Sequence, residues 1–156
     1  AEEILGVEIS MAIIDIFLNP ASPRAYRPLI SISNLKSILE KAEVWVVPTH
    51  NPEGLNVVHG WESDGFWYQD ESYRKNKRDV NENGFFDYIV GVGNDSDGVD
   101  LNRNYDLNWF FGDEAYEADL GGCNVAYYSD FDYYKGTIPF SESEVRAIRD
   151  LAISDS

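Results

Sequence analysis

The chain has 156 residues, 44% of them hydrophobic and 14% aromatic, which is enough apolar material for one domain with a core. Its 28 acidic residues against 12 basic ones give a formal net charge of −16, which argues against nucleic-acid and anionic-membrane partners because both need basic surfaces. The single cysteine excludes an internal disulfide bond and a cysteine-based zinc cluster.

The N-terminal third predicts two helices and one strand. Residues 4–18 carry apolar side chains at helical spacing with only a narrow polar stripe, which predicts a largely buried helix. Three prolines in residues 19–28 end this helix, and residues 34–42 predict a second, shorter one. The apolar run EVWVVP at 43–48 indicates a central strand buried on both faces. This order of elements is typical of an α/β fold.

Residues 49–140 form a long, aromatic and acidic stretch rich in glycine and asparagine, which we expect to be irregular and to carry function. Within it, the segment AYYSDFDYY at 126–134 is interpreted as loop aromatics that cover the edge of a core. Regular structure returns with a helix that runs to about Leu151. Its predicted start is a capping box of Ser141 and Glu144.

The segment DVNENGFFD at 79–87 resembles the first nine residues of a calcium-binding loop. Side-chain oxygens stand at its first, third, fifth and ninth positions: Asp79, Asn81, Asn83 and Asp87. Gly84 takes the turn position, whereas Val90 replaces the bidentate glutamate of position twelve, so Asp95 or Asp97 would have to supply the missing oxygens. The alternative is an Asn-Gly-rich turn without a metal.

Asn102 and Arg103 place an amide beside a forked guanidinium in the segment GVDLNRNYDLNW at 98–109. This pair suits a carboxylate, because a guanidinium can donate two parallel hydrogen bonds to both carboxylate oxygens. A single arginine is more often a solvated surface charge, so the surrounding pattern has to decide between the two interpretations.

That pattern consists of four motifs in a fixed order along the chain. They are NPEGL at 51–55, YRKNKR at 73–78, GVDLNRNYDLNW at 98–109 and YKGTIPFSESEVRAI at 134–148. Together they resemble the zinc carboxypeptidases of the carboxypeptidase A type. The resemblance implies that residues 1–156 are part of a single catalytic domain, with a mixed, mostly parallel sheet flanked by helices.

The resemblance also implies a function and residue roles. The enzyme would be a zinc-dependent exopeptidase that hydrolyses the C-terminal peptide bond of peptides or proteins. Asn102 and Arg103 would bind the substrate carboxylate, Arg74 would stabilise the oxyanion, and Asp100 would orient a zinc-binding histidine. Glu3 would be a zinc ligand. An extracellular or periplasmic location is the corresponding expectation for the compartment.

The remaining zinc ligands are expected outside this chain. By the resemblance, one histidine would precede Ala1, and the second histidine and the catalytic glutamate would follow Ser156, so the 156 residues alone are expected to be inactive. His50 and His59 are interpreted as ordinary loop histidines. Two other functions stay open: an N-acyl amino acid amidohydrolase of the same superfamily, and a non-catalytic calcium-binding module.

Overall fold

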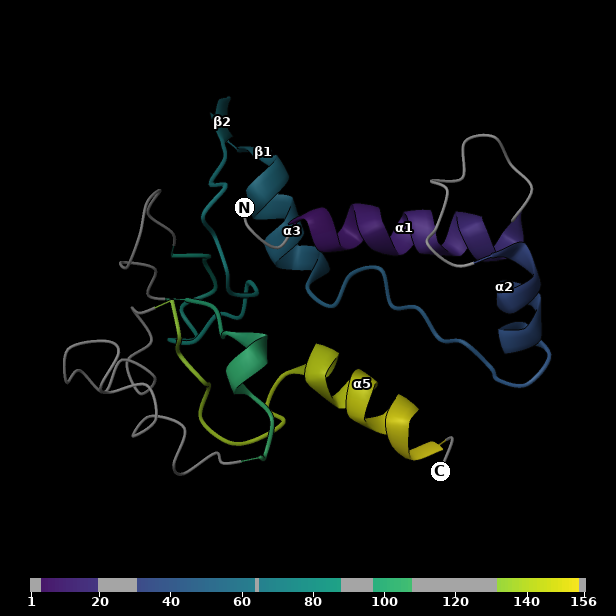
Figure 1. Cartoon of the computed structure of the whole chain (residues 1–156). Helices are drawn as coiled ribbons and strands as arrows, with labels where there is room; N and C mark the ends of the chain where they lie inside the picture. Colours follow the sequence, from purple (N-terminus) through teal and green to yellow (C-terminus); the bar gives the residue numbers. More distant parts are fainter. Residues whose placement is uncertain (1–3, 20–30, 64, 88–96, 108–131, 155–156) are drawn as a thin grey trace, which may run out of the picture. The chain divides into compact units, whose positions relative to one another are not determined.

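A computed structural model describes residues 4–19, 31–63, 65–87, 97–107 and 132–154. The chain divides into two compact units, one up to His50 and one from Asn51 onwards. Figure 1 shows the elements in chain order, and each unit is described by itself.

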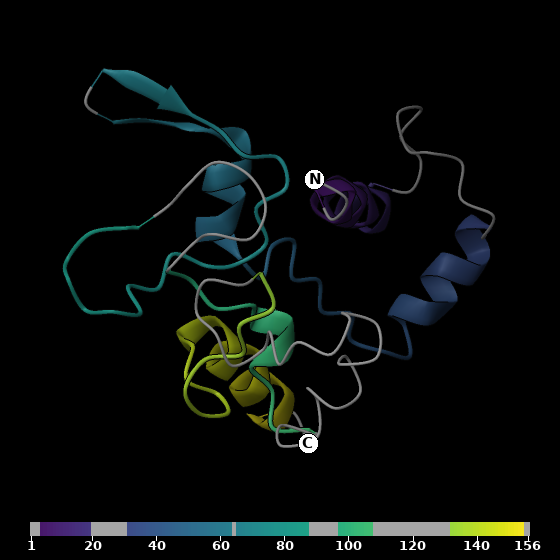
Figure 2. The same ribbon diagram turned by 90° about the vertical axis from the view of Figure 1, so that its left-hand side faces the viewer.

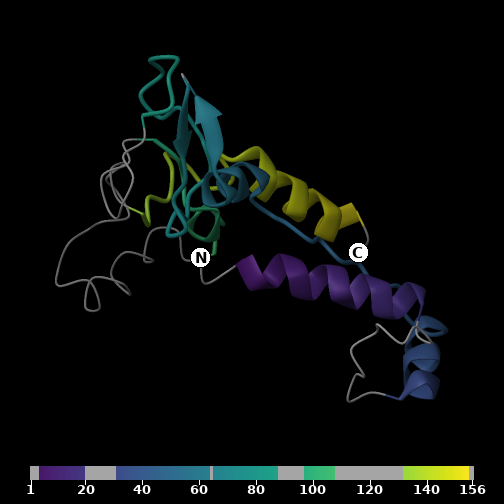
Figure 3. The ribbon, with the colours of Figure 1, turned by 90° about the horizontal axis from the view of Figure 1, so that it is seen from above.

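The first unit contains two helices, α1 (Ile4–Leu18) and α2 (Ile32–Leu39). The bounds of α1 are those predicted from its apolar spacing, and Figure 3 shows it as one uninterrupted helix. Helix α2 begins two residues before the predicted position, because the Ser31 hydroxyl caps it by accepting a hydrogen bond from the backbone N–H of Asn34 at 3.2 Å.

Two predictions for this unit are wrong in the described residues. Helix α1 is not largely buried, since Ile9, for example, is 56% exposed. Residues 43–48 form no strand, and Trp45 is 54% exposed. Both errors have one physical cause. An apolar helix or strand of this kind becomes buried only when it packs against or within a sheet. The described residues contain no parallel strand with which the 43–48 segment could pair.

The second unit begins with helix α3 (Pro52–His59), inside the stretch that we expected to be irregular. The Asn51 side chain caps this helix by accepting from the Gly54 N–H at 2.8 Å, and a proline occupies its first turn. The buried residues Val57 and Val58 form its inner face.

An antiparallel hairpin follows, β1 (Trp61–Ser63) and β2 (Phe66–Tyr68), in which Trp61 pairs with Tyr68. Figure 2 shows the hairpin extending from the end of α3. It is the one sheet of the described residues. The observed structure is therefore helical with a small antiparallel sheet, and the predicted mixed, mostly parallel sheet is not seen in these residues.

The rest of the second unit contains the 3₁₀ turn η1 (Leu101–Arg103) and helix α5 (Ser143–Ser154). Helix α5 starts two residues after the predicted N-cap, Ser141. The Ser141 hydroxyl instead donates to the Glu142 carboxylate at 2.8 Å and accepts from the Asn104 amide at 2.7 Å, so tertiary contacts replace the predicted capping box. Among the described helices, none combines the length and the apolar character that a membrane span requires.

Candidate active site

Two of the motifs are held side by side by their backbones. The N–H of Asn76 donates to the carbonyl of Val99 at 3.0 Å, and the N–H of Gly98 donates to the carbonyl of Arg78 at 2.8 Å. Gly98 has a φ of +86°, and a Cβ at this position would collide with the Asn76 carbonyl and lie 2.8 Å from Lys75 Cβ. Glycine is therefore required here both for the backbone conformation and for the close approach.

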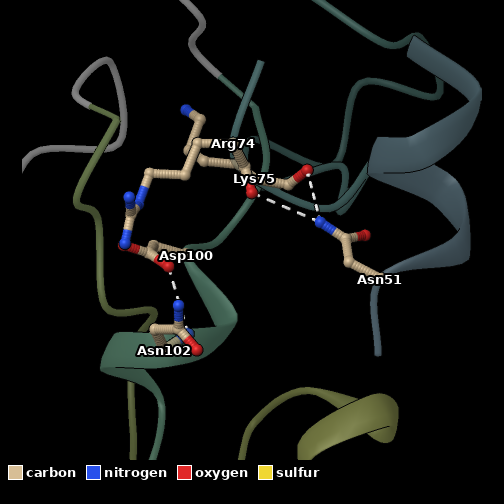
Figure 4. A network of polar contacts seen from close by, with 5 residues as sticks. All are labelled: Asn51, Arg74, Lys75, Asp100 and Asn102. Carbon is tan, nitrogen blue, oxygen red and sulfur yellow. Dashed lines mark hydrogen bonds and ion pairs between the residues drawn. The ribbon is translucent and has the colours of Figure 1, made fainter. Parts of the chain in front are cut away.

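Asn51 connects helix α3 to the same region. While its side-chain oxygen caps the helix, its Nδ2 donates to the carbonyl of Lys75 at 2.9 Å and to that of Arg74 at 3.3 Å (Figure 4). The amide thus binds two successive backbone carbonyls, those of Arg74 and Lys75, and helps to fix where the Arg74 side chain starts.

Two buried asparagines join the fourth motif to the others. Asn104, which is 0% exposed, donates through Nδ2 to the Lys135 carbonyl at 2.9 Å and accepts through Oδ1 from the N–H of Glu142 at 3.1 Å. Asn76 donates through Nδ2 to the Glu142 carboxylate at 2.7 Å. Because buried polar groups are stable only when hydrogen-bonded, these contacts define one arrangement of the three segments.

Arg74 and Asp100 form an ion pair within this scaffold. The Arg74 Nε donates to Asp100 Oδ2 at 2.7 Å, and the backbone N–H of Asn102 donates to Asp100 Oδ1 at 3.1 Å (Figure 4). The Asp100 side chain is 2% exposed, whereas that of Arg74 is 25% exposed. Burial raises the pKa of Asp100 above its usual value of 3.8, and the positive charges of Arg74 and Arg103 oppose this shift.

The ring of Tyr133 contacts both arginines of the predicted site. The Arg74 guanidinium carbon lies 5.0 Å from the ring centroid, and that of Arg103 lies 5.6 Å from it. Both distances are within the range of cation–π attraction. The two guanidinium groups therefore belong to one site, although 29 positions separate them in the sequence.

The structure thus brings together three of the predicted site residues: Arg74, Asp100 and Arg103. Asn102 lies in the same 3₁₀ turn as Arg103 and is exposed. Glu3, the predicted zinc ligand, lies outside the described residues. Within the described ranges, no three His, Cys, Asp or Glu side chains gather in a way that could hold a metal ion. These residues do not form a zinc site by themselves.

The predicted calcium loop is closed by its own hydrogen bonds. Asp79 accepts from the N–H of Gly84 at 2.8 Å, while the amides of Asn81 and Asn83 donate to Asp87 Oδ2 at 2.7 and 2.6 Å. The buried Asp97 carboxylate accepts from the N–H of Asp87 at 2.7 Å. Val90 and Asp95 lie outside the described residues. These hydrogen bonds hold the four predicted residues in one loop, and the calcium ion itself stays a prediction.

Sequence reasoning missed four residues that build the site: Asn51, Asn76, Asn104 and Tyr133. A local signal existed for Asn51, since Asn-Pro-Glu is an N-cap followed by proline and an acidic residue. The other three contact partners that are distant in the sequence, so no local pattern indicates their roles. The interpretation of the 126–134 aromatics as a core edge was incomplete, because Tyr133 packs on the two arginines.

Comparison with known proteins gives one match. No curated protein and no solved structure matches the chain. The family model described as zinc carboxypeptidase matches residues 1–156, the whole of the chain, which agrees with the four ordered motifs and with the arginine pair that they assemble. The chain therefore belongs to the zinc carboxypeptidase family.

Proposed function

We propose that the full-length protein containing this chain is a zinc-dependent exopeptidase that hydrolyses the C-terminal peptide bond of peptides or proteins. Asn102 and Arg103 bind the substrate carboxylate, and Arg74 stabilises the oxyanion that forms at the scissile carbonyl. The observation that carries the proposal is the joint packing of Arg74 and Arg103 on the ring of Tyr133. This packing supports a site in which one short substrate end reaches both guanidinium groups.

The dimensions of a C-terminal residue support this assignment. Its carboxylate and the preceding carbonyl are separated by about one peptide unit, ~3.8 Å, and each guanidinium holds its oxygen at about 3 Å. The two guanidinium carbons lie 5.0 and 5.6 Å from one ring centroid, so their separation is of the same order as this span, which supports the assignment. A carboxylate receives two parallel charge-assisted hydrogen bonds from Arg103, and the exposed Asn102 amide lies in the same turn to add a donor.

Asp100 supports the second arginine. Its carboxylate accepts from Arg74 Nε, so the guanidinium is oriented before substrate binds, and preorganised donors are the main source of oxyanion stabilisation. The roles of Glu3 as a zinc ligand and of Asp100 in orienting a zinc-binding histidine enter the proposal through family membership alone. So does the predicted mixed, mostly parallel sheet of the complete domain.

The proposal is tested by replacing Arg103 and changing the substrate terminus. Arg103→Ala in the full-length protein should reduce kcat/KM for peptides with a free carboxylate by a factor of about 100 or more, since a charged bidentate contact is lost. The same variant should lose far less against the corresponding C-terminal amides. Arg149→Ala is the control, because Arg149 pairs with Asp150 on helix α5 and should leave both activities unchanged. An equal loss on acid and amide would contradict the role of Arg103.

An N-acyl amino acid amidohydrolase is the alternative function, since it would bind the same carboxylate with the same Asn-Arg pair. The two activities are separated by comparing the hydrolysis of peptides with that of N-acyl amino acids by the same preparation. Faster hydrolysis of N-acyl amino acids would replace the proposed peptidase activity with the alternative.

We also propose that Ca²⁺ binds the loop formed by residues 79–87 and Asp97, in a protein that is extracellular or periplasmic. The support is the grouping of Asp79, Asn81, Asn83 and Asp87 in one loop. The Tm should rise with added Ca²⁺ and fall with a chelator, because a ligand of the folded state stabilises it by mass action. Asp79→Ala should abolish the response. An unchanged Tm in millimolar Ca²⁺ would rule out the ion and, with it, the calcium-module alternative.

A further inference from the structure

We propose that Tyr133 is the positioning residue that sets the separation of the two substrate-binding arginines, and thereby the recognition of a single residue beyond the scissile bond. The inference rests on the proposed function of Arg74 and Arg103. It goes beyond that function because the proposed function gives Tyr133 no role in binding or catalysis.

The backbone next to Tyr133 is held in place by its neighbours in the chain. The carbonyl of Tyr134 accepts a hydrogen bond from the N–H of Asp100 at 2.8 Å, so the segment is tied to the residue that binds Arg74. Gly136 has a φ of +83°, and a Cβ there would lie 2.7 Å from Ser141 Oγ and 2.9 Å from Asn104 Nδ2. The backbone on the C-terminal side of Tyr133 is thus held closely against the buried network.

The chemistry of the ring explains why an aromatic residue suits this position. The face of a phenol ring carries negative potential, so it attracts a guanidinium that lies over it. Two guanidinium groups near each other repel, and a ring that contacts both offsets part of this repulsion while holding them at set distances. Arginine stacks on aromatic faces with its N–H groups directed outward in the guanidinium plane, which is the direction in which it binds carboxylates.

Asp100 has a different part in the arrangement. Its carboxylate fixes Arg74 through Nε at 2.7 Å, but it contacts the neighbouring turn through the backbone N–H of Asn102. Tyr133 contacts both guanidinium groups directly. Loss of the ring should therefore remove the contact that the two guanidinium groups share, while the Arg74–Asp100 pair persists.

The experiment measures binding without catalysis. Zinc-free full-length protein is titrated with a fluorescent N-acylated tripeptide that ends in phenylalanine, and with its C-terminal amide, and the ratio of the two Kd values reports carboxylate recognition. The wild type should prefer the acid. Tyr133→Phe keeps the ring face and should keep this ratio within about twofold, whereas Tyr133→Leu should reduce it by about tenfold.

Two controls separate positioning from folding. Tyr68→Leu removes another half-buried tyrosine of the same unit, one that stacks on Trp61 at 5.3 Å rather than on an arginine, and should leave the ratio unchanged. In the Arg103→Ala background, Tyr133→Leu should cause no further reduction, because Tyr133 acts through that arginine. If Tyr133→Leu does not fold, Tyr133→Gln provides the same measurement with a polar side chain suited to a half-buried position.

The outcomes distinguish the two proposals. Suppose that the wild type prefers the acid and that a folded Tyr133→Leu or Tyr133→Gln variant has the same preference. This result would overturn the role of Tyr133 and leave the proposed function intact. An equal loss in Tyr133→Phe would overturn it as well, since the hydroxyl and not the ring face would then be responsible. A wild type that binds acid and amide equally would overturn the proposed carboxylate site itself. In the zinc-loaded enzyme, Tyr133→Leu should raise KM for acid substrates more than it lowers kcat.

Discussion

Asn102 and Asn104 are two asparagines of the same turn with different predicted roles. Asn102 is predicted to bind substrate, and Asn104 is predicted to stabilise the fold. The Asn104 side chain is 0% exposed and connects the backbones of Lys135 and Glu142, whereas Asn102 is exposed. We predict that Asn104→Ala unfolds the protein at much lower denaturant concentration, and that Asn102→Ala does not.

The magnitude follows from the groups that lose their partner. Asn104→Ala leaves the Lys135 carbonyl and the Glu142 N–H without the amide that pairs them, and both residues are only 4% exposed. Each buried polar group left unsatisfied costs about 1–3 kcal/mol, so the free energy of unfolding should fall by about 2–6 kcal/mol. This is a large fraction of the ~5–15 kcal/mol typical of a domain. Asn102→Ala should change it by less than about 0.5 kcal/mol.

The measurement is urea unfolding of the full-length variants, followed by tryptophan fluorescence, alongside kcat/KM on acid and amide peptides. Asn102→Ala should lower acid hydrolysis with unchanged stability, and Asn104→Ala should lower stability. Equal unfolding free energies for the two variants would refute the claim that the Asn104 amide holds the segments together. A destabilised Asn102→Ala would refute its assignment to binding.

Three further predictions concern the scaffold and the arginine pair. Arg74→Ala should lower kcat by roughly two to three orders of magnitude with little change in KM, and an effect on KM alone would make Arg74 a binder of the ground state. Gly98→Ala should lower the Tm far more than Gly84→Ala in thermal unfolding, because both glycines have positive φ but only Gly98 has atoms where a Cβ would lie; equal shifts would contradict this. Burial raises the pKa of Asp100 in the folded state above 3.8. Between pH 3.8 and that raised pKa, the folded state therefore binds more protons than the unfolded state. Because of this difference, the contribution of Asp100 to the free energy of unfolding decreases as the pH rises through this window. Asp100→Asn should remove that slope in urea titrations across the acidic range, and an unchanged slope would show that other groups cause it.

What the sequence predicted well depends on local patterns and on ordered motifs. The spacing of apolar residues was sufficient for α1, because a helix satisfies its backbone hydrogen bonds internally. The motifs containing Arg74, Asp100 and Arg103 were sufficient to group these residues, and the structure places their side chains together.

The failures arise where structure depends on distant partners. The run at 43–48 has the composition of a buried strand, but a strand exists only beside another strand, and none in the described residues pairs with it. Helix α3 was overlooked because Gly54 and Asn56 weakened the helical pattern, although the Asn51 cap and Pro52 indicated its start. The hairpin was also overlooked, despite an Asp-Gly pair between two short aromatic segments.

The roles of Asn76 and Asn104 are beyond local reasoning for a different reason. Their amides satisfy groups that lie more than 20 positions away, and an asparagine in a loop usually indicates only a turn. Among the described residues of this unit, however, eight buried side chains are polar or charged and seven are apolar. The buried polar and charged residues are Asp70, Lys75, Asn76, Asp97, Asp100, Asn104, Lys135 and Glu142.

A site held by buried polar groups behaves differently from one held by an apolar core. An apolar core tolerates substitutions of similar volume, whereas a hydrogen-bonded network requires each donor to meet its acceptor. Arg74 is oriented by Asp100, whose backbone N–H is bound by the Tyr134 carbonyl, and Tyr133 beside it contacts both arginines. A substitution at any of these contacts should therefore alter the geometry of the arginine pair even when it is too mild to unfold the domain. We therefore predict that the proposed recognition of a substrate carboxylate and the stability of the scaffold depend on the same few hydrogen bonds.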